Sequence, residues 1–191
     1  MKKGNVNCGE NTHKTSMEHS AAVKLIEYED LETQGQSRWA DLGCGRGTFT
    51  KALADLLGEG SRIYAIDENK AALRSLPPLY KGVHIEALAA NFVRDDWPTQ
   101  LDGILMANSL HFVADQATFL RKLKQHLKAQ GQLILVEYDT ERSNPWVPYP
   151  HDIATWRELF LEAGFAFASE IARRPSAYGR AEIVGLATSL L

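Results

Sequence analysis

Apolar positions follow two alternating spacings along the chain. Runs of mainly apolar residues, typical of strands, alternate with segments whose apolar positions recur every three or four residues, as in a helix with one buried face. The run 101–107 is apolar at nearly every position, which is typical of a strand buried on both faces. The pattern predicts strands over 38–42, 62–66, 83–89, 101–107 and 132–137. It predicts helices over 17–32, 48–57, 69–76, 116–129 and 153–163.

The end of the chain breaks this alternation. Two late strand candidates, 166–173 and 182–188, are joined by a segment rich in Pro, Ser and Gly, which favours an antiparallel hairpin. The predicted fold class is therefore α/β: a Rossmann-like, seven-stranded, mostly parallel sheet with helices on both faces and a C-terminal antiparallel hairpin. We expect a mobile N-terminal segment, residues 1–16, followed by one domain, residues 17–191.

Composition and charge narrow the choice of partners. The net charge of −3 disfavours nucleic acid as the main partner, because binding phosphates requires concentrated Lys and Arg. The two cysteines, Cys8 and Cys44, form neither a metal-ligand pattern nor a disulfide framework, so no metal is expected. The sequence has no signal-peptide pattern and no apolar run of membrane-spanning length. We therefore expect a cytoplasmic protein with no membrane partner, either a monomer or a homodimer.

A glycine-rich segment joins the first predicted strand to the following helix. Residues 39–47 read Trp-Ala-Asp-Leu-Gly-Cys-Gly-Arg-Gly, with Gly43, Gly45 and Gly47 in the turn. Glycine lets a ligand approach the backbone closely, and the next helix begins with free N–H groups. Ligands of open α/β sheets bind at this edge, where the strands have their carboxyl ends. A turn without a ligand is the alternative interpretation.

The spacing around this turn separates two classes of nucleotide ligand. A dinucleotide fingerprint requires Gly-x-Gly-x-x-Gly or a final Ala, whereas Thr48 follows Gly47 here. Asp67 ends the second predicted strand, and its carboxylate could accept hydrogen bonds from both hydroxyls of a ribose. As an alternative, Asp67 could cap the helix that follows it. The pattern indicates a nucleoside-containing ligand without requiring a pyrophosphate.

Residues 40–47, Ala-Asp-Leu-Gly-Cys-Gly-Arg-Gly, resemble the first motif of class I S-adenosylmethionine-dependent methyltransferases, in particular the small-molecule members of types 11 and 25. Asp67 resembles the acid that binds the ribose in these enzymes, and residues 101–112 resemble their fourth strand and the segment after it. The final hairpin resembles the antiparallel pair that separates this fold from dehydrogenases. The resemblance implies S-adenosyl-L-methionine as the cofactor.

The resemblance also implies a set of cofactor-binding residues. Asp41 corresponds to the acid that reaches the amino group of the methionine part, although it could instead only tie down the turn. Asn91 stands where these enzymes often have an Asp beside the adenine, and its amide oxygen can still accept a hydrogen bond from the adenine amino group. The implied set is Asp41, Gly43, Cys44, Gly45, Gly47, Asp67, Glu68, Asn91, Phe92 and Asn108.

Three residues are candidates for the methyl acceptor's side of the site. His111 follows the fourth strand, where it could be a catalytic general base and contact the substrate, or equally a packed histidine. Trp146 and Tyr149 belong to a loop rich in Pro and aromatic residues that follows the fifth strand. Their rings could form flat walls of a substrate pocket, and a rigid structural loop is the alternative.

Together these features predict an enzyme that transfers a methyl group from S-adenosylmethionine to a small, partly apolar or aromatic acceptor. One alternative is a binding module that retains S-adenosylmethionine without catalysis. A second is a nicotinamide-dependent oxidoreductase, which Thr48 and the late hairpin disfavour.

Overall fold

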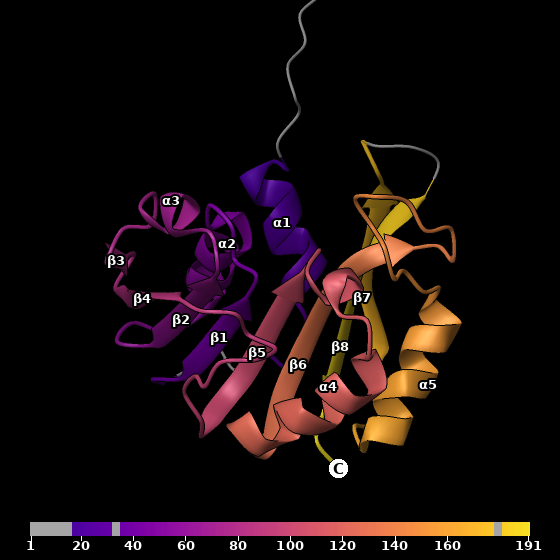
Figure 1. Ribbon diagram of the computed structural model, residues 1–191. Coiled ribbons are helices and arrows are strands. Elements are labelled where there is room, and N and C mark those ends of the chain that lie inside the picture. Colours follow the sequence, from indigo (N-terminus) through magenta and orange to yellow (C-terminus); the bar gives the residue numbers. More distant parts are fainter. Residues whose placement is uncertain (1–16, 32–34, 178–180) are drawn as a thin grey trace, which may run out of the picture.

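The computed structural model describes residues 17–31, 35–177 and 181–191 of the chain. An eight-stranded sheet forms its centre, in the order β3-β4-β2-β1-β5-β6-β8-β7 (Figure 1). The strands are β1 Arg38–Leu42, β2 Arg62–Asp67, β3 Leu79–Tyr80, β4 Val83–Ala89, β5 Leu101–Ala107, β6 Leu127–Asp139, β7 Ser169–Pro175 and β8 Glu182–Ser189. The α-helices are α1 His19–Ile26, α2 Thr48–Leu56, α3 Lys70–Leu73, α4 Gln116–Leu123 and α5 Ile153–Ala163. Two single-turn 3₁₀ helices are η1 Leu110–Phe112 and η2 Lys124–His126.

The five strands β4, β2, β1, β5 and β6 run parallel, and β8 then lies antiparallel between β6 and β7. This arrangement confirms the predicted Rossmann-like sheet with its C-terminal antiparallel hairpin. The number of strands is eight rather than seven, because Leu79–Tyr80 adds a short antiparallel strand beside β4. Lys81 and Gly82 both have positive φ, so the chain reverses in a tight turn and pairs with itself there.

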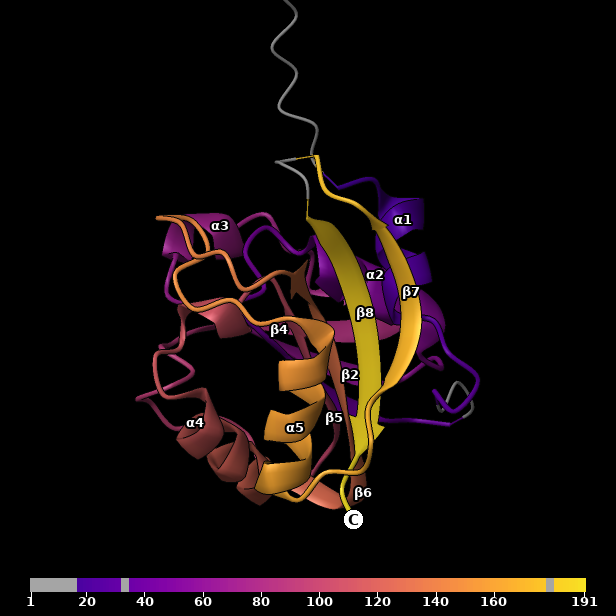
Figure 2. The ribbon, with the colours of Figure 1, turned by 90° about the vertical axis from the view of Figure 1, so that its right-hand side faces the viewer.

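Helices cover both faces of the sheet, with α1 and α2 on one face and α4 and α5 on the other (Figure 2). Trp39 and Ile63 are buried in the first of the two layers. Trp156 and Phe160 of α5 are buried in the second. With both faces covered, the ends of the strands are the parts of the sheet left for a ligand, as is general in open α/β sheets. No helix in the described part of the chain is both long and apolar enough to cross a membrane.

The helix predicted over 116–129 is shorter in the structure. α4 ends at Leu123, and β6 already begins at Leu127, which pairs with Leu101 of β5. The ring of His126 stacks on Trp97 at 3.5 Å between centroids, and its Nδ1 lies 3.1 Å from the carbonyl oxygen of Pro98. These contacts with a distant part of the chain override the local helical spacing.

Candidate functional site

The glycine turn lies at the carboxyl edge of the sheet, between β1 and α2. The backbone N–H groups of Gly43 and Cys44 both donate to the carbonyl oxygen of Ile66 in β2, which fixes the start of the turn against the neighbouring strand. Gly43 has a φ of 77°, and a methyl group added to it would lie 2.6 Å from Cβ of Ser109. The position therefore requires glycine, both for its backbone conformation and for the close approach of the chain after β5.

Gly45 combines a positive φ of 53° with open space, since no atom lies within 4 Å of a methyl group built on it. Its N–H donates to Oδ2 of Asp67, with 2.8 Å between the two atoms. The other carboxylate oxygen, Oδ1, accepts from the N–H of Asn69 at 2.7 Å. Because a carboxylate offers about four acceptor positions, Asp67 keeps acceptor capacity for ligand hydroxyls.

Asn69, and not Asp67, caps the helix that follows β2. Asn69 occupies the N-cap of α3, where its Oδ1 accepts from the N–H groups of Ala71 and Ala72. Asp67 instead joins the end of β2 to the glycine turn.

Asp41 is buried in β1, directly beneath the turn. Its Oδ2 accepts from the hydroxyl of Thr50 in α2 at 2.6 Å. Removal from water raises the pKa of this carboxyl group to about 7, since burial disfavours the charged form; the Thr50 hydrogen bond opposes the rise and the nearby Asp67 charge adds to it. A ligand cation placed beside Asp41 would favour its ionised form.

Asn108 has two unusual properties at the end of β5. Its φ is 53°, in the left-handed region that residues other than Gly rarely adopt. Its side-chain oxygen Oδ1 is buried and has no hydrogen-bond partner among the described residues. The hydroxyl of the neighbouring Ser109 donates to the carbonyl oxygen of Leu42 at 2.6 Å. This bond holds the chain at Asn108, and with it the buried Oδ1, close to the glycine turn. A buried acceptor without a partner is unfavourable in the free protein and fits a donor supplied by a ligand.

Glu68, Asn91 and Arg94 form a polar cluster beyond the end of β2. The amide nitrogen of Asn91 donates to Oε1 of Glu68 at 2.7 Å, and Arg94 donates to the same oxygen at 3.2 Å. Oδ1 of Asn91 already accepts from the N–H groups of Val93 and Arg94. In this arrangement both polar atoms of the Asn91 side chain are engaged within the protein, so contact with an adenine amino group would require a rearrangement or a second acceptor.

The side chains of Phe92 and Cys44, two of the predicted cofactor-binding residues, contact different parts of the structure. A Cβ atom built on Gly43 would lie 3.5 Å from Cε1 of Phe92, so the Phe92 ring lies against the turn. Cys44 has a buried side chain that packs with Ala65, Leu73 and Ile85. Burial raises the pKa of this thiol, which leaves it unreactive.

His111 lies in η1, three residues after Asn108, and pairs with a residue that the sequence analysis did not single out. Its Nδ1 is 2.6 Å from Oε2 of Glu137, and its backbone N–H donates to Oε1 of the same carboxylate at 3.2 Å. Both side chains are almost completely buried. The signal for Glu137 in the sequence is that it is the one acid among the apolar residues 133–138.

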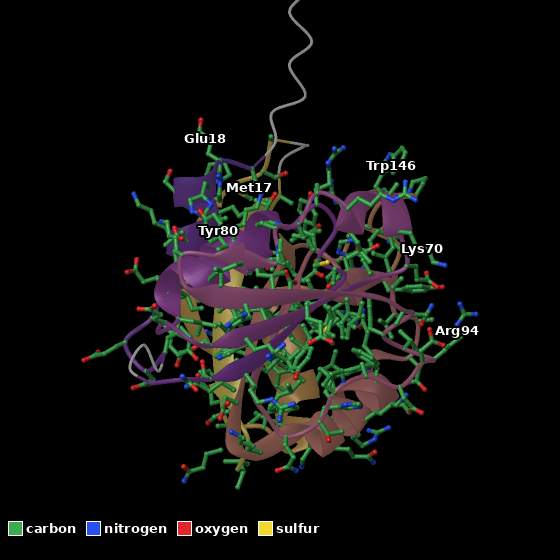
Figure 3. All side chains as sticks on the ribbon, turned by 90° about the vertical axis from the view of Figure 1, so that its left-hand side faces the viewer. Met17, Glu18, Lys70, Tyr80, Arg94 and Trp146 are labelled. Carbon is green, nitrogen blue, oxygen red and sulfur yellow. The ribbon has the colours of Figure 1, made fainter. Side chains whose placement is uncertain are left out.

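The loop after β6 is anchored to η1. The N–H of Tyr149 donates to the carbonyl oxygen of His111 at 3.0 Å, and Gln116 donates to the carbonyl oxygens of Leu110 and Tyr149. Three aromatic residues of this region remain exposed: Phe112, Trp146 and Tyr149. Figure 3 shows Trp146 extending outward at the end of the molecule that also carries Lys70 of α3. The structure thus connects Tyr149 to His111, whereas Trp146 contacts solvent.

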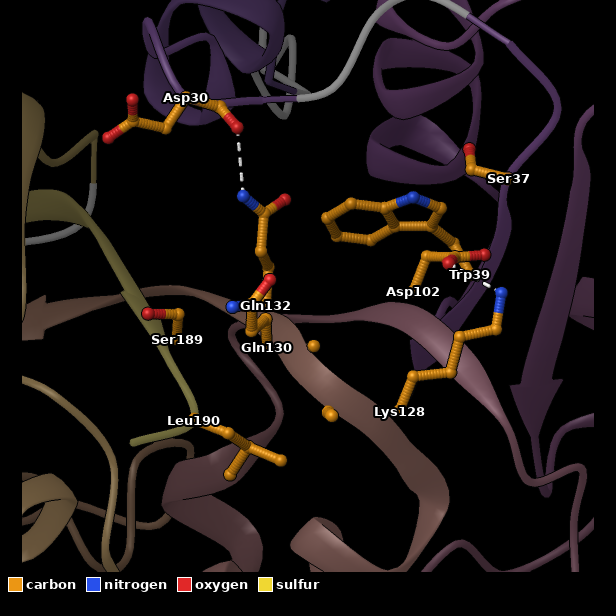
Figure 4. A pocket seen from close by; sticks show the side chains of 11 residues that line it. Asp30, Ser37, Trp39, Asp102, Lys128, Gln130, Gln132, Ser189 and Leu190 are labelled. Atoms are coloured by element: carbon orange, nitrogen blue, oxygen red, sulfur yellow. Dashed lines mark hydrogen bonds and ion pairs between the residues drawn. The ribbon is translucent and has the colours of Figure 1, made fainter.

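A cavity of about 620 Å³ lies at the opposite, amino edge of the sheet (Figure 4). Two polar contacts join residues that line it. Lys128 binds Asp102 at 2.6 Å, and Gln132 donates to the carbonyl oxygen of Asp30 at 2.8 Å. None of the predicted site residues lines this cavity. The predicted segment 1–16 lies outside the described residues.

Comparison with known proteins finds methyltransferases. The family model of a methyltransferase domain matches residues 40–133, which include the glycine turn, Asp67 and His111. A probable cobalt-precorrin-6B C(15)-methyltransferase (decarboxylating) from Pyrobaculum calidifontis is 36% identical over 53 residues. That match covers 28% of this chain and 27% of the relative, so the chain aligns with about a quarter of the relative's length.

Solved structures share the whole fold at low identity. An S-adenosylmethionine-dependent methyltransferase from Methanosarcina mazei aligns with a TM-score of 0.67 and 16% identity, over 87% of this chain and 99% of that one. The 1,6-didemethyltoxoflavin-N1-methyltransferase of Burkholderia thailandensis, solved with S-adenosylhomocysteine bound, has a TM-score of 0.64 and 20% identity over 82% of this chain and 72% of that one. The magnesium protoporphyrin IX methyltransferase of Synechocystis, solved with S-adenosylmethionine, has a TM-score of 0.62 and 15% identity over 82% and 71%. Residues 40–133 therefore form a methyltransferase domain, and the chain has the fold of class I S-adenosylmethionine-dependent methyltransferases, with S-adenosylmethionine as the cofactor.

Proposed function

We propose that this protein transfers the methyl group of S-adenosylmethionine to a small, partly apolar or aromatic acceptor at the carboxyl edge of the sheet. The observation that carries the proposal is the buried Oδ1 of Asn108 beside the glycine turn, which has no hydrogen-bond partner among the residues that the structure describes. Together with the buried carboxyl group of Asp41, it provides two acceptors for the amino group of a methionine moiety. An ammonium group only donates hydrogen bonds, so both an amide oxygen and a carboxylate oxygen can bind it.

The other residues fit the remaining parts of the cofactor. Asp67 retains acceptor capacity for the ribose hydroxyls, and the open space at Gly45 allows a close approach to the backbone. Phe92 lies against the turn and offers an apolar surface to the adenine. The proposed cofactor-binding set is therefore strongest for Asp41, Gly45, Asp67 and Asn108. Any contribution from Cys44 is limited to its backbone, because its side chain is packed elsewhere.

The sulfonium of the cofactor supplies a methyl group that is already activated for transfer. The protein's task is then to hold the acceptor in line with that methyl group and to keep water out. Tyr149 and Phe112 lie next to His111 and expose 46% and 57% of their surfaces, which supports an acceptor with an apolar or aromatic part. The Burkholderia and Synechocystis proteins are named for small organic acceptors, which agrees with this class.

Calorimetric titration with S-adenosylhomocysteine, run in parallel with NAD⁺, tests the proposal. We expect saturable binding of S-adenosylhomocysteine at one site and none of NAD⁺. Binding of NAD⁺ alone would refute it. Transfer of a labelled methyl group to small aromatic compounds then separates an enzyme from a module that only binds the cofactor.

A further inference from the structure

A buried carboxylate and a buried imidazole are paired at the carboxyl ends of β5 and β6. Glu137 has 1% of its surface exposed and His111 has 2%. Within the described part of the chain, both oxygens of Glu137 contact only His111: Oε2 lies 2.6 Å from Nδ1 of the ring, and Oε1 accepts from the backbone N–H at 3.2 Å. The carboxylate therefore determines both the place of His111 and the orientation of its ring.

This pairing determines which ring nitrogen is basic. An ionised carboxylate only accepts hydrogen bonds, so Nδ1 must carry the proton that lies between the two groups. The neutral imidazole then has its lone pair on Nε2. No residue in the described ranges forms a hydrogen bond with Nε2. Among the described residues, the buried side-chain atoms that lack a hydrogen-bond partner belong to Tyr28, Asp55, Asn108 and Trp156. Nε2 of His111 is not one of these atoms.

His111 lies between the cofactor side and the aromatic loop. Asn108 and Ser109 precede it and approach the glycine turn, while its own carbonyl oxygen binds the N–H of Tyr149. The rings of Phe112 and Tyr138 contact the imidazole, with centroids 4.3 Å and 6.1 Å away. A purely structural tie between β5 and β6 would not require an ionisable pair, because burying two charges carries a large desolvation cost.

We propose that Glu137 is a positioning residue that holds His111 as a general base, and that the methyl acceptor is therefore protic, reacting through a hydroxyl or a ring N–H. This inference rests on the proposed methyl transfer. His111 takes the proton of the acceptor's O–H or N–H bond at Nε2, and the electron pair of that bond stays on the acceptor atom. That atom forms the new bond to the methyl carbon, while the pair of the carbon–sulfur bond remains on sulfur. The positive charge thus passes to His111, where Glu137 stabilises it, and the proton later leaves to water.

The tautomer of His111 tests the role of Glu137 without any acceptor. In long-range ¹H–¹⁵N NMR spectra of the uniformly labelled full chain, we expect a protonated Nδ1 and an unprotonated Nε2 for His111, assigned with His111→Gln. In Glu137→Gln the amide can also donate, so a substantial fraction should shift to the tautomer protonated at Nε2. The matched control Glu86→Gln lies on the surface in an ion pair with Arg62 and should leave the spectrum unchanged. An Nε2-protonated wild type, or a tautomer unaffected by Glu137→Gln, would overturn the proposal.

Methyl transfer to three probes, phenol, phthalimide with its ring N–H, and thiophenol, tests the acceptor class. Because positioned general bases contribute about 10²–10⁴-fold, we expect Glu137→Gln and His111→Gln to lower kcat for the O–H or N–H probe by at least 10²-fold. The KM for S-adenosylmethionine should stay within about threefold. The protic assignment would be refuted if the protein methylated only thiophenol or none of the probes. It would also be refuted if Glu137→Gln and His111→Gln lowered kcat equally for all three probes. Binding of S-adenosylhomocysteine is measured on the same samples, so a failure of the proposed function is seen separately. Glu137→Asp provides a second variant if Glu137→Gln does not fold.

Discussion

The backbone N–H of Gly45 donates to the carboxylate of Asp67, with 2.8 Å between the nitrogen and Oδ2. This bond joins the turn after β1 to the end of β2, two segments that the sequence analysis assigned to one ligand on separate grounds. Asp67 has a second task as well, because Oδ1 accepts from the N–H of Asn69 at the start of α3. The acid therefore orders the edge of the site and still offers acceptor positions to a ligand.

Replacement of Asp67 by Ala is expected to weaken the binding of S-adenosylhomocysteine at least tenfold. The substitution removes the acceptor for the ribose hydroxyls and also the anchor of Gly45, and hydrogen bonds to a charged group contribute about 1.5–3 kcal/mol each. Calorimetric titration measures the change. Asp102→Asn is the control, because this acid lies at the opposite edge in an ion pair with Lys128. Equal affinity of wild type and Asp67→Ala would remove Asp67 from the site.

Two glycines provide a matched pair for testing the turn. Gly45 and Gly35 both have positive φ, 53° and 92°, and neither has an atom within 4 Å of an added methyl group. Alanine at either place therefore carries a similar backbone strain of about 1–2 kcal/mol. Only Gly45→Ala projects its methyl group into the space proposed for the cofactor. We expect both variants to lose similar thermal stability and only Gly45→Ala to lose S-adenosylhomocysteine binding. A loss of binding in both would attribute the effect to strain.

Asp41 is expected to make the stability of the free protein depend on pH. Its pKa is about 7 when folded, against about 3.9 for an unperturbed Asp. Between these values the folded chain retains a proton that the unfolded chain has released, so the free energy of unfolding falls as the pH rises. The fall from this one group is about 1.4 kcal/mol per pH unit and ends near pH 7.

Urea unfolding of wild type and Asp41→Asn at several pH values isolates this effect. The difference in unfolding free energy between variant and wild type should grow from about pH 4 to pH 7 and stay constant above it. A difference that is the same at all pH values would mean that Asp41 is ionised in the folded protein throughout this range.

Asn108 is expected to contribute to binding at the expense of stability. Its buried Oδ1 has no partner in the described part of the chain, which costs about 1–3 kcal/mol, and its backbone adopts a conformation natural for glycine. Asn108→Gly should therefore raise the thermal midpoint of the free protein and lower its affinity for S-adenosylhomocysteine at least tenfold. Thermal unfolding with and without the ligand checks both effects. A less stable variant with unchanged affinity would show that Asn108 only supports the fold.

Local patterns in the sequence were sufficient to predict the sheet, the hairpin, the glycine turn and the acid at the end of β2. These features depend on spacing within a few residues, and the comparisons confirm the family that they indicate. The engagement of Asn91 by Glu68 and of His111 by Glu137 could not be read in this way. Each pair joins residues on different strands or loops, 23 and 26 positions apart, so it depends on which strands become neighbours in the sheet.

A crystal structure with S-adenosylhomocysteine bound would test the central claim most directly. The account predicts ribose hydroxyls about 3 Å from the carboxylate of Asp67 and the ligand's amino group at hydrogen-bond distance from Oδ1 of Asn108. It also predicts that the sulfur lies on the side of the site where His111 and Tyr149 meet. Binding at the amino edge, in the cavity lined by Asp102 and Lys128, or a ligand that leaves Oδ1 of Asn108 without a partner would contradict it.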